Sequence, residues 1–294
     1  MKKKLNVSLV IPSHKGKKKL PKLINSIKEN TFLPKEIIIC GTNKSDINLI
    51  NKEDIKSLNI IFLLSKIKNQ VYQRKKAIDN AKYDLIFQLD DDVILEKNYI
   101  FNMSKHFKLG NEKKVVSAII FTDKKKHQGI RWNNAYYKNF LFRKCLYFLN
   151  GFQKIRYMSI IKSGRIIPLM PREFLNYHKM KNSKKFLKNV QWVCSSNAYL
   201  KKYRKEAFLF QTNNKKSYFE DVFFSHSLYQ KKFNLLIDGS CIAYHSTNDP
   251  TNFFNYRNTI SSQYNIVKLF KKNLLLFYLD VFIFSLVHIF ITKK

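Results

Sequence analysis

Short, uninterrupted apolar segments alternate with segments of helical periodicity over the first 120 residues. The apolar segments are residues 5–11, 36–40, 60–64, 84–89 and 115–121, and helices are expected over 20–27 and 70–81. Strands that are apolar throughout and that alternate with helices are typical of a parallel sheet covered by helices on both faces. We therefore expect an α/β fold with a mostly parallel central sheet.

In a sheet of this kind, ligands bind beyond the carboxyl ends of the strands. Residues 12–14 and 40–43 lie at that edge, together with three consecutive acids, Asp90, Asp91 and Asp92. Adjacent carboxylates repel, so holding them ionised needs a compensating cation, either nearby lysines or a divalent ion such as Mg²⁺ or Mn²⁺ that prefers oxygen ligands. An acidic triplet also occurs in surface loops and in first helical turns, where it has only a structural role.

The composition limits the choice of partners. The 294 residues, 45% of them hydrophobic, are enough for one large domain or for a domain with an appendage. Lysine and arginine total 55 against 20 acids, and the net charge of +35 favours anionic partners. Only 8 of the 55 are arginine, however, and an AT-rich coding sequence would give the same bias without selection for charge.

Other classes of protein lack support in the sequence. Lysine runs such as 17–19 are typical of solvated faces, and the chain has no zinc-finger or RNA-recognition signature, so no specific nucleic-acid partner is expected. The four cysteines are far apart and form no CxxC pair, which favours a reduced, cytoplasmic protein. The first 15 residues resemble an opening strand more than a signal peptide.

An ordered set of motifs resembles a known enzyme family. LVIPSHK, IIICGTNKSD and QRKKAIDNAKYDLIFQLDDDV are followed by NVQWVCSSNAYLKKYRKEAF, by YFEDVFFSHSLYQKKFNLLIDGSCIAYH and by YRN at 256–258. Together they resemble the nucleotide-sugar domain of family-two inverting glycosyltransferases, which have a GT-A fold. The likeness covers most of residues 5–260 in the expected order.

The resemblance implies roles for the donor-side residues. Asp90 and Asp92 match the two acids of the family's DxD motif, Asp90 on the donor ribose and Asp92 on a metal, and Asp91 takes the middle place beside the donor. Three further matches are implied: Pro12 and Ser13 border the nucleotide base, and Arg74 is the arginine of the helix before the DxD strand. Pro12 could instead simply end a strand, and Arg74 could instead cap its helix or lie on a solvated face of it.

The implied cofactors are a divalent cation, Mn²⁺ or Mg²⁺, and a nucleotide-diphospho-sugar, with UDP-sugar as the expected donor. His245 matches a position that completes the metal site or contacts the diphosphate, although a lone histidine after a strand is often structural. One departure weakens the expectation of uridine. Gly41 and Thr42 stand where the family commonly has acids, and Asn43 or Asp46 could substitute.

The acids Glu220 and Asp221 begin an expected helix, where their charges would also suit the helix dipole. By the resemblance, Asp221 is the general base that removes the proton of the acceptor hydroxyl, and Glu220 orients the base or the acceptor. General-base catalysis contributes about 10²–10⁴-fold to a rate. Residues 195–197 are expected to line the acceptor side.

Residues 274–291 are 18 mostly apolar residues flanked by lysines. As a helix they would be about 27 Å long against a bilayer core of ~30 Å, and Asp280 lies within them, so we expect a helix that lies on a membrane or is buried in protein more than one that spans a bilayer. The expected domains are a nucleotide-sugar half, 1–125, an acceptor and catalytic half of the same domain, 126–265, and a membrane-associating helix, 266–294.

The resemblance thus implies a metal-dependent inverting glycosyltransferase that acts on a glycan or lipid-linked acceptor in bacterial surface polysaccharide synthesis. Such an enzyme is expected at the anionic inner face of the cytoplasmic membrane. Two alternatives stay open: a non-catalytic basic protein that binds membranes or nucleic acid on a degenerate GT-A fold, and a nucleotidyltransferase with the same layout.

Overall fold

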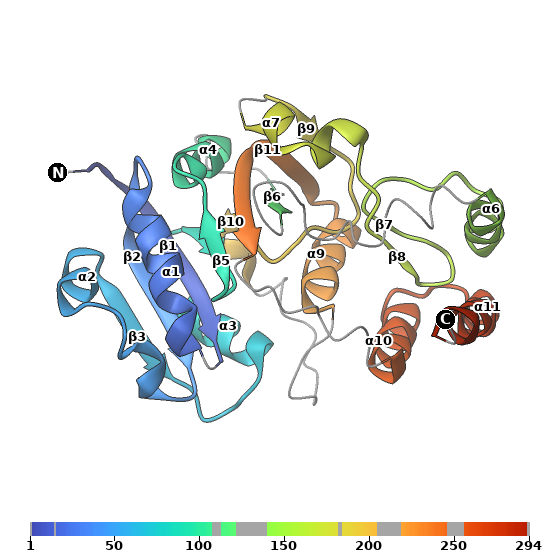
Figure 1. Ribbon diagram of the computed structural model, residues 1–294, viewed down its shortest axis with the longest axis horizontal. Helices are drawn as coiled ribbons and strands as arrows, with labels where there is room; N and C mark the ends of the chain where they lie inside the picture. Colours follow the sequence, from blue (N-terminus) through green and yellow to red (C-terminus); the bar gives the residue numbers. More distant parts are fainter. Residues whose placement is uncertain are drawn as a thin grey trace. The chain divides into compact units, whose positions relative to one another are not determined.

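The computed structural model describes residues 2–14, 16–107, 113–121, 140–181, 184–204, 219–245 and 256–292. The chain divides into two compact units (Figure 1). The first unit is residues 1–128 with 172–248, and the second is 129–171 with 249–294. The boundaries expected at 125 and 265 concern functional halves and stay predictions.

The first unit contains one mixed sheet in the order β3-β2-β1-β4-β10-β6-β11-β5, with β9 paired to β11. Its first half is parallel and consists of β1 (Lys4–Ser13), β2 (Leu33–Gly41), β3 (Ile60–Leu64) and β4 (Leu85–Gln88). The interiors of β1 and β2 are fully buried, which explains why these strands have no polar alternation. The expected α/β fold with parallel strands is confirmed in this half.

The second half of the sheet mixes strand directions. It consists of β5 (Val93–Leu95), β6 (Lys114–Phe121), β9 (Phe186–Leu187), β10 (Asn197–Leu200) and β11 (Asn234–His245). β10 lies antiparallel between β4 and β6, β11 is parallel to β6, and β5 is antiparallel to β11. The pairing of β5 with β11 brings the residues just after β4 beside the end of β11.

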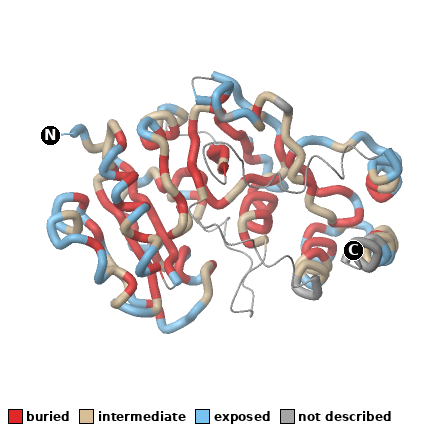
Figure 2. The backbone as a smooth tube through the Cα atoms, in the orientation of Figure 1, coloured by how far each residue is buried: buried red, intermediate tan, exposed pale blue. Residues whose placement is uncertain are grey.

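Helices cover this sheet and leave most strand residues buried (Figure 2). α1 (Leu20–Glu29) packs on β5, α3 (Gln70–Asp79) on β1 and β2, and α4 (Tyr99–Ser104) on β11. Asn69 caps α3 by accepting a hydrogen bond from the backbone N–H of Tyr72 at 3.1 Å. The other helices among the described residues of this unit are α2 (Lys52–Ser57), α7 (Tyr177–Met180), α9 (Glu220–Gln230) and the short 3₁₀ segments Gly16–Lys18, Lys44–Ile47, Lys105–Phe107, Arg172–Leu175 and Lys201–Tyr203.

The second unit has a small core of its own. It contains α6 (Phe140–Leu149), the hairpin of β7 (Ser159–Ile160) and β8 (Ile166–Ile167), α10 (Tyr256–Leu269) and α11 (Leu274–Thr292). The core residues are Leu146, Leu149, Ile161 and Ile167. In the described part of the chain, no helix meets the length and hydropathy that a membrane crossing requires.

Candidate active site

The carboxyl ends of β1 and β4 lie side by side because these parallel strands pair directly, Val10 opposite Gln88. Asp90, Asp91 and Asp92 follow β4, and Ser13 ends β1, so the segments come together at one edge of the sheet. Pro12 is buried beside this edge, opposite Cys40 of β2. Sheet geometry alone therefore collects residues that are about 80 positions apart in the sequence.

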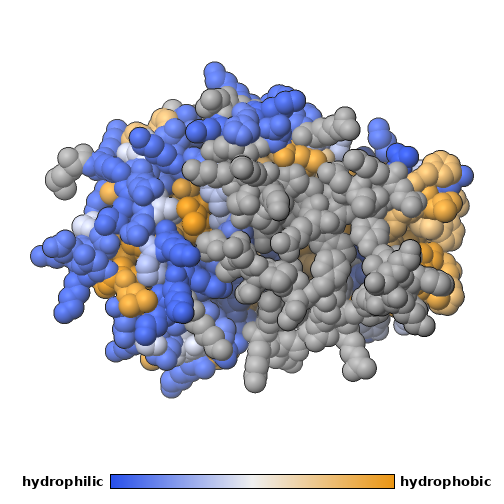
Figure 3. Space-filling model, viewed as in Figure 1, coloured by the Kyte–Doolittle hydropathy of each residue, from blue (hydrophilic) through white to orange (hydrophobic). Residues whose placement is uncertain are grey.

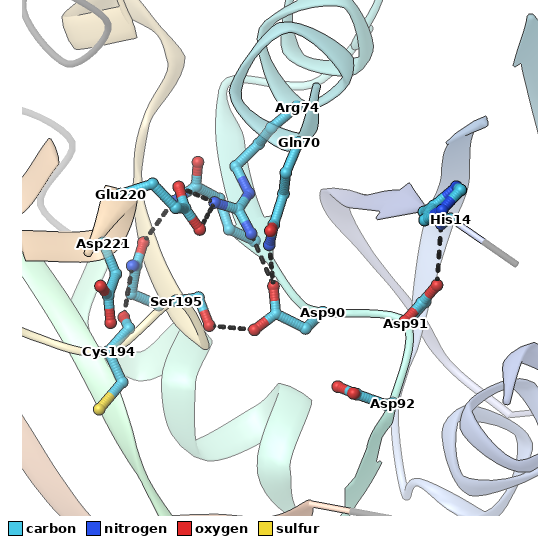
Figure 4. A network of polar contacts seen from close by, with 12 residues as sticks. His14, Gln70, Arg74, Asp90, Asp91, Asp92, Cys194, Ser195, Glu220 and Asp221 are labelled. Atoms are coloured by element: carbon cyan, nitrogen blue, oxygen red, sulfur yellow. Dashed lines mark hydrogen bonds and ion pairs between the residues drawn. The ribbon is translucent and has the colours of Figure 1, made fainter. Parts of the chain in front are cut away.

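The three aspartates point in different directions. Figure 4 shows Asp91 extending toward His14, whereas Asp90 and Asp92 extend to the other side of their backbone segment. Asp91 accepts hydrogen bonds from Ser13 Oγ at 3.0 Å and from the backbone N–H of His14 at 3.2 Å. Burial raises the pKa of Asp91 to about 6, against the opposing effects of Lys19 and these hydrogen bonds. Asp91 thus ties the loop after β1 to the loop after β4.

Asp92 forms a pair with His245. The Nε2 atom of His245 lies 3.2 Å from Asp92 Oδ1, and Lys19 Nζ lies 3.2 Å from Asp92 Oδ2. The pair forms because Val93, the first residue of β5, is opposite His245, the last residue of β11. Burial would raise the pKa of Asp92, but His245 and Lys19 lower it below its ordinary value, so Asp92 is ionised.

Asp90 and Glu220 share the guanidinium of Arg74. Asp90 Oδ1 lies 2.7 Å from Arg74 Nη2, and both carboxylate oxygens of Glu220 contact Arg74 Nη1. Asp90 also accepts hydrogen bonds from Gln70 Nε2 at 3.1 Å and from Ser195 Oγ. Arg74 is only 1% exposed, and although burial would lower its pKa, Glu220 and Asp90 raise that pKa above its ordinary value. One buried cation therefore joins the acids after β4 to the acids that begin α9.

Asp221 is the acid of this cluster that Arg74 does not bind directly. Its Oδ1 accepts a hydrogen bond from the backbone N–H of Val222 at 2.9 Å. Burial raises the pKa of Asp221 to about 7, and the nearby charges of Glu220 and Asp90 add to the effect. Phe219, just before the helix, adopts a left-handed backbone conformation with φ 59°, which is strained for a residue of this size.

A family profile described as "Glycosyl transferase family 2" matches residues 8–164, more than half of the chain. The chain belongs to glycosyl transferase family 2. No curated protein matches the sequence of this family-2 protein.

Solved structures show the same fold. A crystal structure of GalNAc-T7 with UDP, GalNAc and Mn²⁺ matches with a TM-score of 0.58 at 14% sequence identity. The match covers 89% of this chain and 48% of the GalNAc-T7 chain. A crystal structure of residues 1–349 of S. aureus TarS matches with a TM-score of 0.53 at 13% sequence identity. The match covers 91% of this chain and 64% of the TarS chain. The family-2 protein thus has the GT-A fold, and it spans about half to two thirds of the length of these two neighbours.

Three residues of this family-2 site make contacts that the sequence does not predict. Lys19 belongs to a lysine run that we assigned to a solvated face, but it lies within 4 Å of both Asp91 and Asp92. The sequence places Gln70 only within a helix and predicts Ser195 on the acceptor side, yet both donate hydrogen bonds to Asp90. No local pattern marks these residues, because what matters is how close the fold brings them to the acids.

Among the described residues, no group of three or more His, Cys, Asp or Glu side chains is arranged to hold a metal ion. Asp92 and His245 do converge, and a carboxylate with an imidazole is a donor set that suits Mn²⁺. These two residues would fit a divalent cation as two of its ligands. The predicted roles of Pro12, Ser13, Arg74, Asp90 and Asp91 in donor binding, and of Asp92 and His245 in metal binding, stay predictions.

Proposed function

We propose that this protein is a divalent-cation-dependent inverting glycosyltransferase that uses a nucleoside-diphosphate sugar, with UDP-sugar as the expected donor. The observation that carries the proposal is the Arg74 bridge, since it joins the DxD acids and the α9 acids in one cluster. A displacement reaction needs a diphosphate site and a proton acceptor in one cavity, and this cluster supports both roles.

Asp221 is the proposed general base. Its carboxylate accepts the proton of the acceptor hydroxyl while the oxygen of that hydroxyl bonds to the anomeric carbon, and the bond from that carbon to the diphosphate oxygen breaks. A pKa of about 7 suits this role, because a base poised near the working pH balances ionisation against proton affinity. Glu220 is held by Arg74 and acts as a positioning residue.

Asp92 and His245 are the proposed metal ligands. A bound Mn²⁺ or Mg²⁺ would stabilise the negative charge that grows on the departing diphosphate. Mn²⁺ and UDP are both present in the GalNAc-T7 structure, which supports the choice of donor and cation. Lys19, beside Asp92, adds a second positive charge on the same side of the site.

Asp46 is the proposed substitute for the missing base-contacting acid. It is buried near the end of β2, and its Oδ2 has no hydrogen-bond partner among the described residues. A Cβ atom at Gly41 would lie 3.3 Å from that oxygen. The carboxylate of Asp46 therefore comes close to where a side chain at position 41 would begin, and it could accept the imide N–H of uracil.

The acceptor is proposed to be a hydroxyl of a glycan or a lipid-linked saccharide in bacterial surface polysaccharide synthesis. That expectation comes from the family resemblance. The stereochemistry is tested by nuclear magnetic resonance of the first product, which should have the anomeric configuration opposite to that of the donor.

The activity is tested with a panel of nucleotide sugars and Mn²⁺, measuring release of the nucleoside diphosphate. We expect Asp221→Asn to lower the rate about 10²–10⁴-fold. We expect Asp92→Asn to abolish the increase in rate that Mn²⁺ gives. Asp79→Asn is the matched control, since Asp79 is a surface acid paired with Lys75 at 3.0 Å. Release of pyrophosphate would instead identify a nucleotidyltransferase, and donor binding without turnover in every variant would identify a non-catalytic protein.

A further inference from the structure

The second unit exposes large apolar side chains on two of its helices. Leu141 on α6 and Leu275 on α11 are each 69% exposed, and Phe282 on α11 is 63% exposed. We call the α6–α11 surface the set of exposed residues Phe140, Leu141, Phe148, Leu275, Tyr278 and Phe282. Figure 3 shows hydrophobic residues gathered over α6 and α11, whereas the coloured part of the first unit that faces the viewer is mainly hydrophilic.

These side chains are not needed for the core of the unit. α6 and α11 already pack against each other through their inner sides, where the rings of Phe142 and Phe284 meet edge to face with centroids 5.2 Å apart. On α11 the exposed residues 275, 278 and 282 are spaced three and four apart, so they form one stripe along the helix. An apolar stripe that is exposed although the inner side is packed indicates a second contact surface.

Asp280 does not interrupt that stripe. It is fully buried and accepts hydrogen bonds from Ser163 Oγ at 2.7 Å and from Arg165 Nε at 2.9 Å. The guanidinium of Arg165 also lies over the ring of Phe284, 3.3 Å from its centroid. The single charge within the apolar segment is therefore turned into the protein and neutralised there, and its insertion cost does not apply to the outer side of α11.

The charges around the surface have one sign. Asp280 is the only acid in residues 140–171 and 256–292. Arg143 and Lys144 on α6 and Lys268 and Lys271 beside α11 are exposed bases. A second copy of the chain would bring the same positive charge to this surface and be repelled, and a nucleic acid would not need the aliphatic stripe. Apolar side chains bordered by bases, without acids, match an anionic lipid bilayer.

We propose that α6 and α11 together form a docking surface that lies in the headgroup region of an anionic lipid membrane. The apolar stripes enter the boundary between headgroups and acyl chains, and the lysines and arginines face the lipid phosphates. α6, which the sequence did not assign to any membrane role, shares the contact with the C-terminal helix. The surface is independent of the glycosyl-transfer chemistry, because it uses none of the residues of the active site.

The test is flotation of the full chain with vesicles of mixed phosphatidylglycerol and phosphatidylcholine, and with vesicles of phosphatidylcholine alone. We expect binding to the mixed vesicles and much weaker binding to the neutral ones. The double variant Leu275→Ser with Phe282→Ser should weaken binding at least about tenfold, and so should Phe140→Ser with Leu141→Ser. Arg143→Gln with Lys144→Gln should reduce the preference for the anionic vesicles.

The matched control is Leu49→Ser with Leu64→Ser, which removes two leucines that are 53% and 49% exposed on the first unit. It should bind as the unchanged protein does, and near-ultraviolet circular dichroism should show that all variants are folded. The proposal is overturned if the unchanged protein does not float with the mixed vesicles, or if the α6 and α11 variants bind these vesicles as well as the control does. A concentration-dependent dimer that these variants abolish would overturn it too, by making a second copy the occupant. Asp92→Asn should bind vesicles normally, which separates this test from that of the enzymatic activity.

Discussion

Asp221 should set the pH dependence of the reaction. A general base must be ionised, and burial holds the pKa of Asp221 at about 7, well above its ordinary value. We expect kcat/KM to fall about tenfold per pH unit below that pKa, and to level off above it. The measurement is kcat/KM against pH at saturating Mn²⁺, and a profile that stays flat down to about pH 5 would exclude Asp221 as the base in the free enzyme.

Asp46 should decide how well the nucleobase binds. Losing a charged hydrogen-bond acceptor costs about 1.5–3 kcal/mol, so Asp46→Asn should weaken UDP binding roughly tenfold or more while leaving pyrophosphate binding unchanged. Gly41→Ala should act in the same direction, because its Cβ would lie 3.2 Å from the ring of Phe62 and 3.3 Å from Asp46 Oδ2. Calorimetry with UDP and with pyrophosphate checks both variants, and an equal loss for the two ligands would point to damage of the diphosphate site.

Helix α3 carries two neighbouring cations that should contribute very differently to the free energy of unfolding. Arg74 is buried between Asp90 and Glu220, whereas Lys75 is exposed and pairs with Asp79 on the surface. Arg74→Met would leave two carboxylates without their cation and should lower the free energy of unfolding by about 3–5 kcal/mol. Lys75→Met should change it by no more than about 0.5 kcal/mol. Denaturant unfolding of the two variants side by side tests the difference, and equal effects would show that the buried network is not a structural element.

Strand pairing explains why the site lies where it does. β5 is only three residues long, yet its antiparallel contact with β11 brings Asp92 to His245. β10 enters between β4 and β6, so Ser195, just before it, reaches Asp90. Neither strand was expected from the sequence, because segments of three or four residues are too short to show a periodicity.

Ligand binding should stabilise the whole first unit, because the site joins segments from its first 92 residues to α9 and β11. UDP with Mn²⁺ at about 100 times the dissociation constant should add ~2.7 kcal/mol to the free energy of unfolding, or roughly 5–11 °C in Tm. EDTA should remove the part of this Tm increase that depends on the cation. The measurement is a thermal shift assay, in which Asp92→Asn should respond to UDP alone and Mn²⁺ should add nothing further.

The net charge of +35 also acts at the level of the molecule. It favours anionic ligands of every kind, so weak binding of nucleic acid at low salt would carry no information about function. Only effects that depend on particular residues, such as those of Asp46, Asp221 or the α6–α11 surface, distinguish a specific ligand from this general attraction.

The amino-acid sequence determined the parallel half of the sheet, the helices that follow β1 and β3, and the family, since these depend on short-range periodicity and on the order of motifs. It also selected Asp90, Asp92, Glu220 and Asp221 as one candidate site. Only the tertiary structure decided how these acids differ. Asp91 is tied to the β1 loop, Arg74 is shared by Asp90 and Glu220, and Asp221 has the pKa suited to a base. The physical reason is that burial and neighbouring charge determine what a carboxylate can do, and here both come from residues that are distant in the sequence.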